Sequence, residues 1–377
     1  MAGKLVVGVI FGGRSGEHEV SLMSARSVLN VLDPEKYEIV QIGITHEGVW
    51  LTGEGVLDAL SRNTQAGLTP MSLALDPTQP GWYGIRNSHP DGQMLERLKA
   101  LDVVIPVLHG SYGEDGTLQG LLEMVDLAYV GAGVLGSALS MDKGVFWDVM
   151  VANAIPVLET RVILRSELES HIESALSRIE AIAPYPLFVK PANLGSSVGV
   201  SKCHSRSDLI EGLMDAARYD RRILVQRGIQ AREIEVSVLG NEDPQASIPG
   251  EILPSREFYS YEAKYIDNRS ELLIPAPIPH ETAEWARQLA VRAFKAVDCA
   301  GMARVDFLLD RENQSQGPEA LYLNEINTIP GFTQISMYPK LWEASGLPYP
   351  TLIDRLIDLA LERKMDRKRT ERRYRAA

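Results

Sequence analysis

The run LFVKPANLGSSVGVSK, from Leu187 to Lys202, joins two apolar segments through a short turn rich in glycine and serine. Its flanks, 187–190 and 198–201, each predict a strand, so we expect the turn to connect two strands and not to open a helix. Backbone N–H groups in such a turn can bind an anion, and the Lys190 ammonium beside it suits a phosphate group. A flexible β-turn without a ligand explains the same residues equally well.

The bulk composition is that of a globular protein with more than one domain. The chain has 377 residues, of which 45% are hydrophobic and 23% are charged, and single cores rarely exceed about 250 residues. The two cysteines, Cys203 and Cys299, provide no disulfide framework. The sequence has neither a signal-peptide pattern nor an apolar run near the roughly 18 residues that span a bilayer. We therefore expect a cytoplasmic location and no membrane partner.

The charge distribution argues against nucleic acid as a partner. The net charge is −12, and a polyanion is attracted to basic surfaces. The C-terminal segment 362–377 is the exception, with eight Lys or Arg against three Asp or Glu. A nucleic-acid-binding arm could have this composition, but a frayed and solvated helix end explains it better, because chain termini concentrate disorder.

Strands and helices alternate in the first part of the chain, as in an α/β layer. Strands are predicted at 5–10, 39–44 and 103–108. Helices follow the first strand, where apolar residues recur at helical spacing up to residue 32, and the third strand, in the run TLQGLLEMV. Between residues 61 and 93 the pattern is lost and four prolines occur, which favours a long loop or insertion.

Two further units follow along the chain. The second unit is predicted to contain a helix over 140–154, the two strands around the glycine turn, a helix over 205–219 and a strand at 223–226. The third has a strand at 234–239, a polar irregular segment at 255–270, a helix at 281–297 and a hairpin formed by 302–310 and 320–327. These patterns predict an α/β (α+β) fold with three domains, 1–131, 132–228 and 229–362, before a basic tail at 363–377.

Oxygen-bearing side chains on the predicted hairpin are candidate metal ligands. Glu325 and Asn327 point to one face of a strand because side chains repeat every two residues, and Asp306 joins them if the two strands pair. Carboxylate and amide oxygens suit Mg²⁺ at nucleotide phosphates, and no His/Cys set suggests zinc. Arg304 shares the face of Asp306 and could stabilise charge on a transferred phosphoryl group or an oxyanion. A solvated hairpin face is the alternative, but polar residues that interrupt apolar runs favour function.

Two polar loops follow predicted strands of the first unit. Glu17 stands where a helix begins, and a carboxylate at a helix N-terminus interacts favourably with the helix dipole. The alternative is that Glu17 anchors the ammonium of an amino-acid substrate. His109 opens the run HGSYGEDG at the carboxyl end of a predicted parallel strand, where open α/β sheets bind ligands. We interpret His109 as a positioning or packing residue in preference to a catalytic base.

Seven motifs together resemble the ATP-grasp superfamily and, within it, the D-alanine–D-alanine ligase family. The resemblance runs from about Leu5 to about Arg363 and is specific only in combination. The motifs are GGRSGEHEVSLMSA, HGSYGEDGTLQG, SMDK, VKPANLGSSVGV, EAKY, ARVDFLLD and LNEINTIPGFT. The resemblance implies an ATP-grasp fold, a homodimer, and a glycine loop that closes over the triphosphate between two antiparallel sheets.

The same resemblance implies a nucleotide and metal site. Two Mg²⁺ ions, for which Mn²⁺ could substitute, are expected on Asp306, Glu325 and Asn327, with Arg304 facing the acyl phosphate. Family members often have a glutamate at the adenine edge where this chain has Gln226, which leaves the contact to the base open. The ATP-binding residues implied by the resemblance are Lys143, Lys190, Ser197, Gln226, Glu233 and Lys264.

The resemblance also implies two amino-acid sites and a lid. Glu17, Ser196 and Tyr265 match a hydrogen-bonded triad near the ammonium of the first D-alanine, and 258–270, which carries Tyr265, matches the lid that excludes water. The residues expected around the two amino acids are Glu17, His109, Arg304, Gly331, Ser336 and Met337.

The implied reaction is the ATP-dependent formation of D-alanyl-D-alanine for peptidoglycan synthesis. The carboxylate of one D-alanine would attack the γ-phosphorus of ATP, and the amine of the second would displace phosphate from the resulting D-alanyl phosphate. A ligase forming D-alanyl-D-serine or D-alanyl-D-lactate is the alternative, although Tyr265 favours the dipeptide because lactate-using relatives replace the KY pair of the lid. A silent nucleotide-binding module should have lost a metal ligand or Arg304, and all are present.

Overall fold

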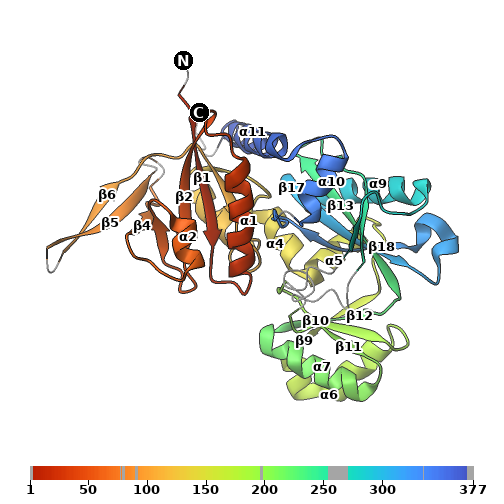
Figure 1. Ribbon diagram of the computed structural model, residues 1–377. Coiled ribbons are helices and arrows are strands. Elements are labelled where there is room, and N and C mark those ends of the chain that lie inside the picture. The colour runs from red at the N-terminus through yellow and green to blue at the C-terminus, as the bar shows by residue number, and fades with distance from the viewer. Residues whose placement is uncertain are drawn as a thin grey trace, which may run out of the picture.

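The computed structural model describes residues 3–76, 78, 81–89, 92–195, 198–253, 271–333 and 335–371. In this part of the chain, three β-sheets carry helices on their faces (Figure 1). The strands of the first sheet all come before residue 130, those of the second from 160–227, and those of the third from 231–327. This mixed α/β architecture agrees with the fold class expected from the sequence.

The first sheet combines a parallel half and an antiparallel half. Its elements are β1 (Leu5–Gly12), α1 (His18–Val31), β2 (Tyr37–Ile44), β3 (Trp50–Thr52), α2 (Val56–Ser61), β4 (Thr69–Leu73), β5 (Trp82–His89), β6 (Gly92–Arg97), β7 (Val103–Val107), α3 (Thr117–Met124) and β8 (Ala128–Tyr129). The strand order is β6-β5-β4-β3-β2-β1-β7-β8. The pairs β1–β2, β1–β7 and β7–β8 are parallel, so the loops after β1 and β7 lie at the same sheet edge.

Of the long loop or insertion expected over 61–93, the loop is wrong. This segment contains β4, β5 and the start of β6, which pair antiparallel and extend the first sheet. Figure 1 shows the β5–β6 hairpin projecting away from the rest of the protein. The signal was weak because few residues of the segment are buried: Met71 on β4 and Trp82 on β5 lie in a core cluster, whereas Met94 and Leu95 on β6 are 51% and 61% exposed.

The second sheet is small, antiparallel and covered by two helices. Before it come α4 (Val134–Met141) and α5 (Lys143–Ala152); the sheet unit itself has β9 (Thr160–Leu164), α6 (Arg165–Glu180), β10 (Leu187–Pro191), β11 (Ser201–Cys203), α7 (Arg206–Tyr219) and β12 (Arg222–Arg227). The strand order is β11-β10-β12-β9. The glycine turn therefore joins two paired strands, as predicted, although the second strand begins at Ser201 and not at residue 198.

Local capping explains two helix starts in this unit. The helix predicted over 140–154 is divided at Asp142, whose side chain accepts hydrogen bonds from the backbone N–H groups of Gly144 and Val145 and so begins α5. Ser205 caps α7 by accepting from the Asp208 N–H. The Asp142 cap fixes the start of α5, where Lys143 is the first residue.

The third sheet contains the predicted hairpin. Its elements are β13 (Ala231–Gly240), β14 (Gln245–Ala246), β15 (Gly250–Leu253), β16 (Glu271–Leu273), α9 (His280–Ala296), β17 (Gly301–Asp310), the 3₁₀ helix η1 (Gln314–Ala320) and β18 (Leu321–Asn327). The order is β16-β15-β13-β17-β18, and β14 pairs with β13. One face of β13 and β17 packs under α9, because Ile234, Val236 and Val305 share a buried cluster with Ala286 and Phe294. The other face is left for the site.

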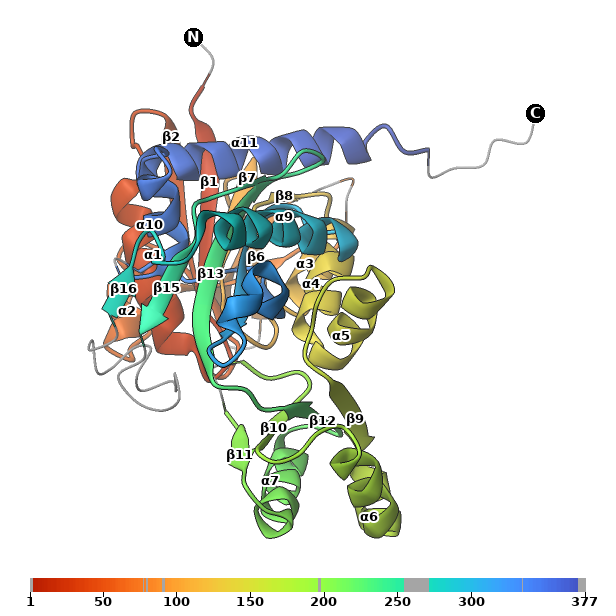
Figure 2. The same cartoon turned by 90° about the vertical axis from the view of Figure 1, so that its right-hand side faces the viewer.

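The C-terminal helices return the chain to the first sheet. They are α10 (Met337–Ala344) and α11 (Tyr349–Arg367), and α11 contacts α1, β7 and β8 (Figure 2). Arg363 donates to the carbonyls of Gly131 and Tyr129, and its guanidinium lies 4.3 Å from the centre of the Tyr129 ring. The segment expected to be frayed from residue 363 therefore begins inside an ordered helix that extends to Arg367.

Composition also led to expectations about disulfides and membranes. Cys203 and Cys299 are both buried and unpaired, so no disulfide joins them. Among the residues that the structure describes, no helix is both long enough and apolar enough to cross a membrane.

Candidate active site

A β-bulge in the third sheet sets which side chains of β18 face the site. Asp306 pairs with Glu325, but Phe307 pairs with Leu323, so Asn324 has no opposite residue. Before the bulge Leu323 faces the buried cluster, and after it Ile326 does. The extra residue thus shifts the alternation by one and turns Glu325 and Asn327 to the face that carries Arg304 and Asp306.

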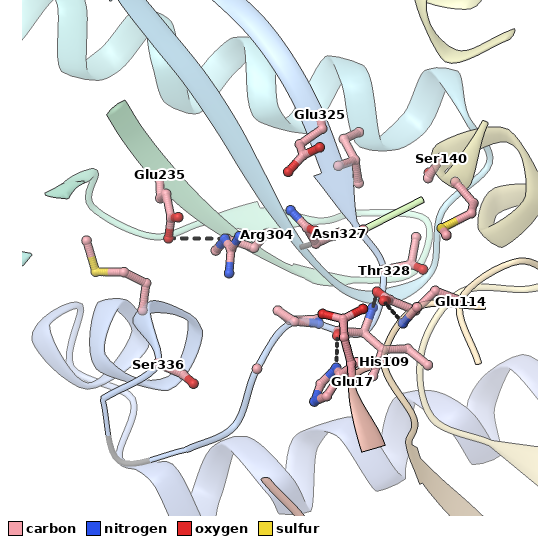
Figure 3. A pocket seen from close by; sticks show the side chains of 18 of the residues that line it. Glu17, His109, Glu114, Ser140, Glu235, Arg304, Glu325, Asn327, Thr328 and Ser336 are labelled. Atoms are coloured by element: carbon pink, nitrogen blue, oxygen red, sulfur yellow. Dashed lines mark hydrogen bonds and ion pairs between the residues drawn. The ribbon is translucent and has the colours of Figure 1, made fainter. Parts of the chain in front are cut away.

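These side chains are joined by hydrogen bonds. Arg304 Nε and Nη2 donate to Asp306 Oδ1 and Oδ2, each at 2.7 Å. Asn327 Nδ2 donates to Asp306 Oδ2 at 2.9 Å. The Arg304 Nε atom also lies 3.1 Å from the Oε2 atom of Glu235 on β13 (Figure 3). The pairing of β17 with β18 that the sequence predicted is therefore present, and Asp306 lies between a cation and an amide.

The donor set suits a hard cation. The part of the chain that the structure describes contains no cluster of three or more His, Cys, Asp and Glu side chains placed to bind a metal. The set formed by Asp306, Glu325 and Asn327 instead has two carboxylates and an amide, which are oxygen donors of the kind that Mg²⁺ prefers. The residues present therefore fit the ion that the sequence led us to expect.

Two lysines approach the same carboxylate. Lys143 Nζ lies 3.7 Å from Glu325 Oε2 and donates to the Leu194 carbonyl at the glycine turn, at 2.9 Å. Burial and the neighbouring Lys143 ammonium lower the pKa of Lys190 to about 8, and Glu325 opposes this shift. The ammonium groups of Lys143 and Lys190, both near Glu325, form a site suited to a polyanion.

Gln226 is engaged inside the protein at both ends of its amide. Its Oε1 atom accepts from Lys190 Nζ at 3.0 Å, and its Nε2 atom donates to Thr160 Oγ1 at 3.2 Å. Lys143, Lys190 and Gln226 line a small pocket between the second sheet and β18. Glu233 lies two residues before Glu235 on β13, on the same face of that strand.

Glu17 immediately precedes α1 and faces two glycines. A Cβ atom built on Gly110 would lie 2.6 Å from Glu17 Oε2, and one built on Gly195 would lie 3.0 Å from it. Gly110 also has a φ of +73°, which a side chain disfavours. The Glu17 carboxylate therefore lies between the loop after β7 and the glycine turn, and Gly195 is the last described residue before Ser196.

His109 links the loop after β7 to the segment after β18. Its Nδ1 atom lies 3.0 Å from the Ile329 carbonyl, which can only accept, so Nδ1 carries the proton. Its Nε2 atom then accepts from Ser24 Oγ at 3.0 Å, and Ser24 Oγ accepts from the Phe332 N–H at 3.3 Å. Burial lowers the pKa of His109. A neutral imidazole with a hydrogen bond at each nitrogen is suited to holding the segment after β18 in place.

Sequence reasoning missed Glu114 as a site residue. Its carboxylate accepts from the backbone N–H groups of Gly110 at 2.7 Å and Ile329 at 3.0 Å. Burial and the negative charge of Glu17 raise the pKa of Glu114 to about 8, against the effect of the two N–H donors. The signal available was an acidic residue within the glycine-rich run HGSYGEDG. Glu235, also missed, is a carboxylate inside the alternating strand IEVSVL.

The turn before α10 closes the other end of the site. A Cβ atom on Gly331 would lie 2.7 Å from Ser336 Oγ, so a side chain there would displace the serine. Ser336 Oγ accepts from the Thr333 N–H at 3.0 Å, and Met337 begins α10. The three residues expected around the second amino acid, Gly331, Ser336 and Met337, therefore lie side by side.

A cavity with about 1030 Å³ of empty space brings most of these residues together (Figure 3). The structure places in its wall the following predicted residues: Glu17, His109, Lys143, Arg304, Glu325, Asn327, Gly331, Ser336 and Met337. Glu114 and Glu235 line it as well. The predictions for Ser196, Ser197, Lys264, Tyr265 and the lid at 258–270 lie outside the described residues.

Known proteins match this chain over nearly its whole length. Residues 6–132 match the D-ala D-ala ligase N-terminus family, and residues 149–358 match the D-ala D-ala ligase C-terminus family. The chain belongs to the D-alanine–D-alanine ligase family. A family member from Thermoanaerobacter sp. (strain X514), named D-alanine--D-alanine ligase, is 52% identical over 95% of this chain and 97% of its own length. Another so named, from Heliobacterium modesticaldum, is 47% identical over 98% of each chain.

Solved structures of this ligase family share the fold. The D-alanine-D-alanine ligase from Coxiella burnetii superposes with a TM-score of 0.82 at 38% identity, over 98% of this chain and 97% of that one. A D-Ala:D-Ser ligase from Enterococcus faecalis superposes with a TM-score of 0.83 at 33% identity, over 95% and 100%. Ligases of this family have the ATP-grasp fold, so the fold expected from the seven motifs is confirmed.

Proposed function

We propose that this protein joins two molecules of D-alanine to form D-alanyl-D-alanine, with ATP converted to ADP and phosphate. The observation that carries this proposal is the cavity in which Arg304, Glu325 and Asn327 of the hairpin face Glu17 and His109 of the first sheet, with Asp306 hydrogen-bonded to Arg304. One wall supplies the groups needed for a polyphosphate, and the other supplies a carboxylate suited to an ammonium. Family membership specifies the two substrates.

The nucleotide would bind between the second and third sheets, with its phosphates on Lys143 and Lys190. Asp306, Glu325 and Asn327 would hold Mg²⁺ or Mn²⁺, which offsets phosphate charge when bound. Glu233 would bind the ribose, and Gln226 would lie near the base; Ser197 and Lys264 would add contacts to the phosphates. Lys190 donates to Gln226 in the structure, and because an ammonium has three N–H donors, it can also contact a phosphate.

The first D-alanine would bind with its ammonium near Glu17 and its carboxylate directed to the γ-phosphate. Attack of that carboxylate on phosphorus forms D-alanyl phosphate and releases ADP. Arg304 would donate to the oxygens on which negative charge develops. Glu17, Ser196 and Tyr265 would form a hydrogen-bonded latch when residues 258–270 close, and closure would keep water from the acyl phosphate.

The second D-alanine would bind against the Gly331–Met337 turn. Its amine attacks the carbonyl of the acyl phosphate, and phosphate leaves as the C–O bond breaks. His109 would act indirectly, because its ring holds the Ile329 carbonyl and Ser24 and thereby fixes the segment that precedes the turn. We further propose a cytoplasmic homodimer that supplies peptidoglycan synthesis, as family membership suggests, and three functional domains at 1–131, 132–228 and 229–362.

A direct product assay tests the proposal. The protein is incubated with ATP, Mg²⁺ and D-alanine alone, or with D-alanine plus D-serine or D-lactate, and the products are identified by mass while phosphate release is followed. We expect D-alanyl-D-alanine and one phosphate for each peptide bond. D-alanyl-D-serine or D-alanyl-D-lactate as the main product would contradict the assignment of the second substrate, and no ATP-dependent product would contradict the ligase itself.

A further inference from the structure

Glu235 is a buried carboxylate that the mechanism above does not use. Only 3% of the residue is exposed, and it lies between Ile234 and Val236, which both pack into the apolar cluster under α9. Its own side chain points to the opposite face of β13 and lines the large cavity. A carboxylate removed from water costs several kcal/mol unless it is paired, so its retention on this wall calls for a partner.

A partner of Glu235 in the structure is Arg304. Antiparallel pairing of β13 with β17 places Glu235 opposite Asp306, and the Glu235 Oε2 atom lies 3.1 Å from Arg304 Nε. The Arg304 side chain is only 16% exposed, so the contact is shielded from solvent. Arg304 thus contacts two carboxylates, Glu235 on one neighbouring strand and Asp306 on its own strand.

Binding of a metal ion would affect these two contacts of Arg304 differently. The guanidinium of Arg304 donates to both oxygens of Asp306 at 2.7 Å, and a metal ion would bind one or both of those oxygens. Metal binding at Asp306 therefore competes with this bidentate contact. Glu235 is not one of the proposed metal ligands, so its contact with Arg304 can persist through that change.

We propose that Glu235 is a positioning residue that draws the Arg304 guanidinium away from Asp306 and so keeps Asp306 available for the metal ion. This inference rests on the proposed function, because it assumes a metal at Asp306. Without Glu235, Arg304 loses a carboxylate partner and pairs more strongly with Asp306, which then competes with metal binding. Glu235 also directs the released guanidinium toward the cavity.

Direct metal binding tests this role without turnover. Mn²⁺ is titrated into the protein in the presence of ADP, and free Mn²⁺ is followed by its EPR signal. In Glu235→Gln the apparent dissociation constant for Mn²⁺ should rise about tenfold, which corresponds to the loss of one contact between charged groups. The matched control is Glu251→Gln, because Glu251 is also buried in this sheet and pairs with Arg232 at 2.6 Å; its Mn²⁺ affinity should stay within about twofold of the wild type.

Testing Glu235→Gln in an Arg304→Met protein separates an effect through Arg304 from direct attraction between Glu235 and the cation. In Arg304→Met no guanidinium competes for Asp306, so adding Glu235→Gln should leave Mn²⁺ affinity unchanged within about twofold. An equal loss in both backgrounds would mean that Glu235 attracts the cation directly, and no loss in either would mean that it does not influence the metal; both results overturn the proposal. Glu235→Asp, which keeps the charge but shortens the reach, should weaken Mn²⁺ binding only when Arg304 is present.

The outcome is independent of the ligase assignment. Thermal unfolding of each variant checks that the fold is intact, and Glu235→Asp replaces Glu235→Gln if the amide does not fold. If the wild type makes no dipeptide from ATP and D-alanine, the proposed function fails. If the wild type makes dipeptide but Glu235→Gln and Glu235→Asp bind Mn²⁺ as the wild type does, only the role of Glu235 fails.

Discussion

Glu114 and Ile329 are 215 positions apart in the sequence, and the Glu114 carboxylate accepts a hydrogen bond from the Ile329 N–H at 3.0 Å. This bond connects the loop after β7 to the segment after β18. The first prediction concerns the pH dependence of the stability that Glu114 contributes. The pKa of Glu114 is raised to about 8 from a usual 4.5, so the folded state holds a proton that the unfolded chain has released in this range.

The contribution of Glu114 to stability should therefore be complete below pH 4.5 and lost as pH rises toward 8. In Glu114→Gln, which cannot titrate, this part of the decline should vanish. The measurement is urea unfolding of both proteins at several pH values between 5 and 9, with Glu312→Gln, an exposed residue after β17, as the control. Parallel pH profiles for wild type and Glu114→Gln would contradict the assignment.

The second prediction concerns Lys190 and ADP. Because its pKa is lowered to about 8, Lys190 is neutral above that pH in the free protein, whereas a bound phosphate favours the charged form. ADP affinity should be flat below pH 8 and fall by up to about tenfold per pH unit above it. Calorimetry in buffers of different ionisation enthalpy should detect proton uptake. Lys190→Met should bind ADP more weakly at every pH and lose the proton uptake; if uptake persists, another group is responsible.

The third prediction concerns the ring of His109. The Ile329 carbonyl can only accept, so the proton should lie on Nδ1, and the lowered pKa should keep the ring neutral at neutral pH. Nitrogen NMR of labelled protein distinguishes the two ring atoms. Ser24→Ala removes the donor to Nε2 and should reduce the free energy of unfolding by about 1–3 kcal/mol without moving the proton. Observation of the Nε2–H form in the wild type would refute this arrangement.

The fourth prediction concerns the proposed metal ligands. Asp306→Asn and Glu325→Gln should each lower kcat for dipeptide formation by about 100-fold or more, since a bound metal supplies several kcal/mol of charge stabilisation. Both variants should still fold, because Glu325 lines the cavity and neither side chain belongs to the buried cluster under α9. Glu312→Gln again serves as the control, with full activity expected. Near-normal turnover in Asp306→Asn and Glu325→Gln would remove these residues from the metal site.

The fifth prediction concerns the C-terminal helix. Arg363 donates to two backbone carbonyls of the first unit, so Arg363→Gln should lower the free energy of unfolding by about 3 kcal/mol. Arg369, whose side chain is 83% exposed and pairs with Asp366, is the matched control, and Arg369→Gln should change stability by less than about 0.5 kcal/mol. Equal effects in the two variants would show that Arg363 is not an anchor.

The two-residue alternation of side chains along a strand accounts for the part of the site that the sequence can predict. Alternation along a strand is enough to place Glu325 with Asn327, and Arg304 with Asp306. The bulge at Asn324 cannot be predicted in this way, because it depends on the register against β17. Without that bulge Glu325 would share the face of Leu323. The sequence therefore predicts which residues share a face within each strand, but it does not predict the bulge that places the pair on β18 and the pair on β17 on the same face of the sheet.

Contacts between distant segments account for what the sequence does not reveal. Glu114 and Glu235 resemble ordinary acidic residues because their partners, Ile329 and Arg304, come from other parts of the chain. The segment 61–93 escapes prediction for a different reason: its strands are half-exposed, so hydrogen bonds and not an apolar stripe define them. In both cases the deciding interaction joins elements that a local pattern does not connect.

The return of α11 to the first sheet has a consequence for synthesis on the ribosome. The cluster that contains Val7, Phe11 and Val130 also contains Leu352 and Ile357, so the first sheet lacks part of its core until residue 357 has been translated. Domains made early generally fold early, but this one must wait with an apolar surface uncovered. A nascent chain stalled before residue 349 should therefore be sensitive to proteases and bound by chaperones, whereas release of the full chain should end both.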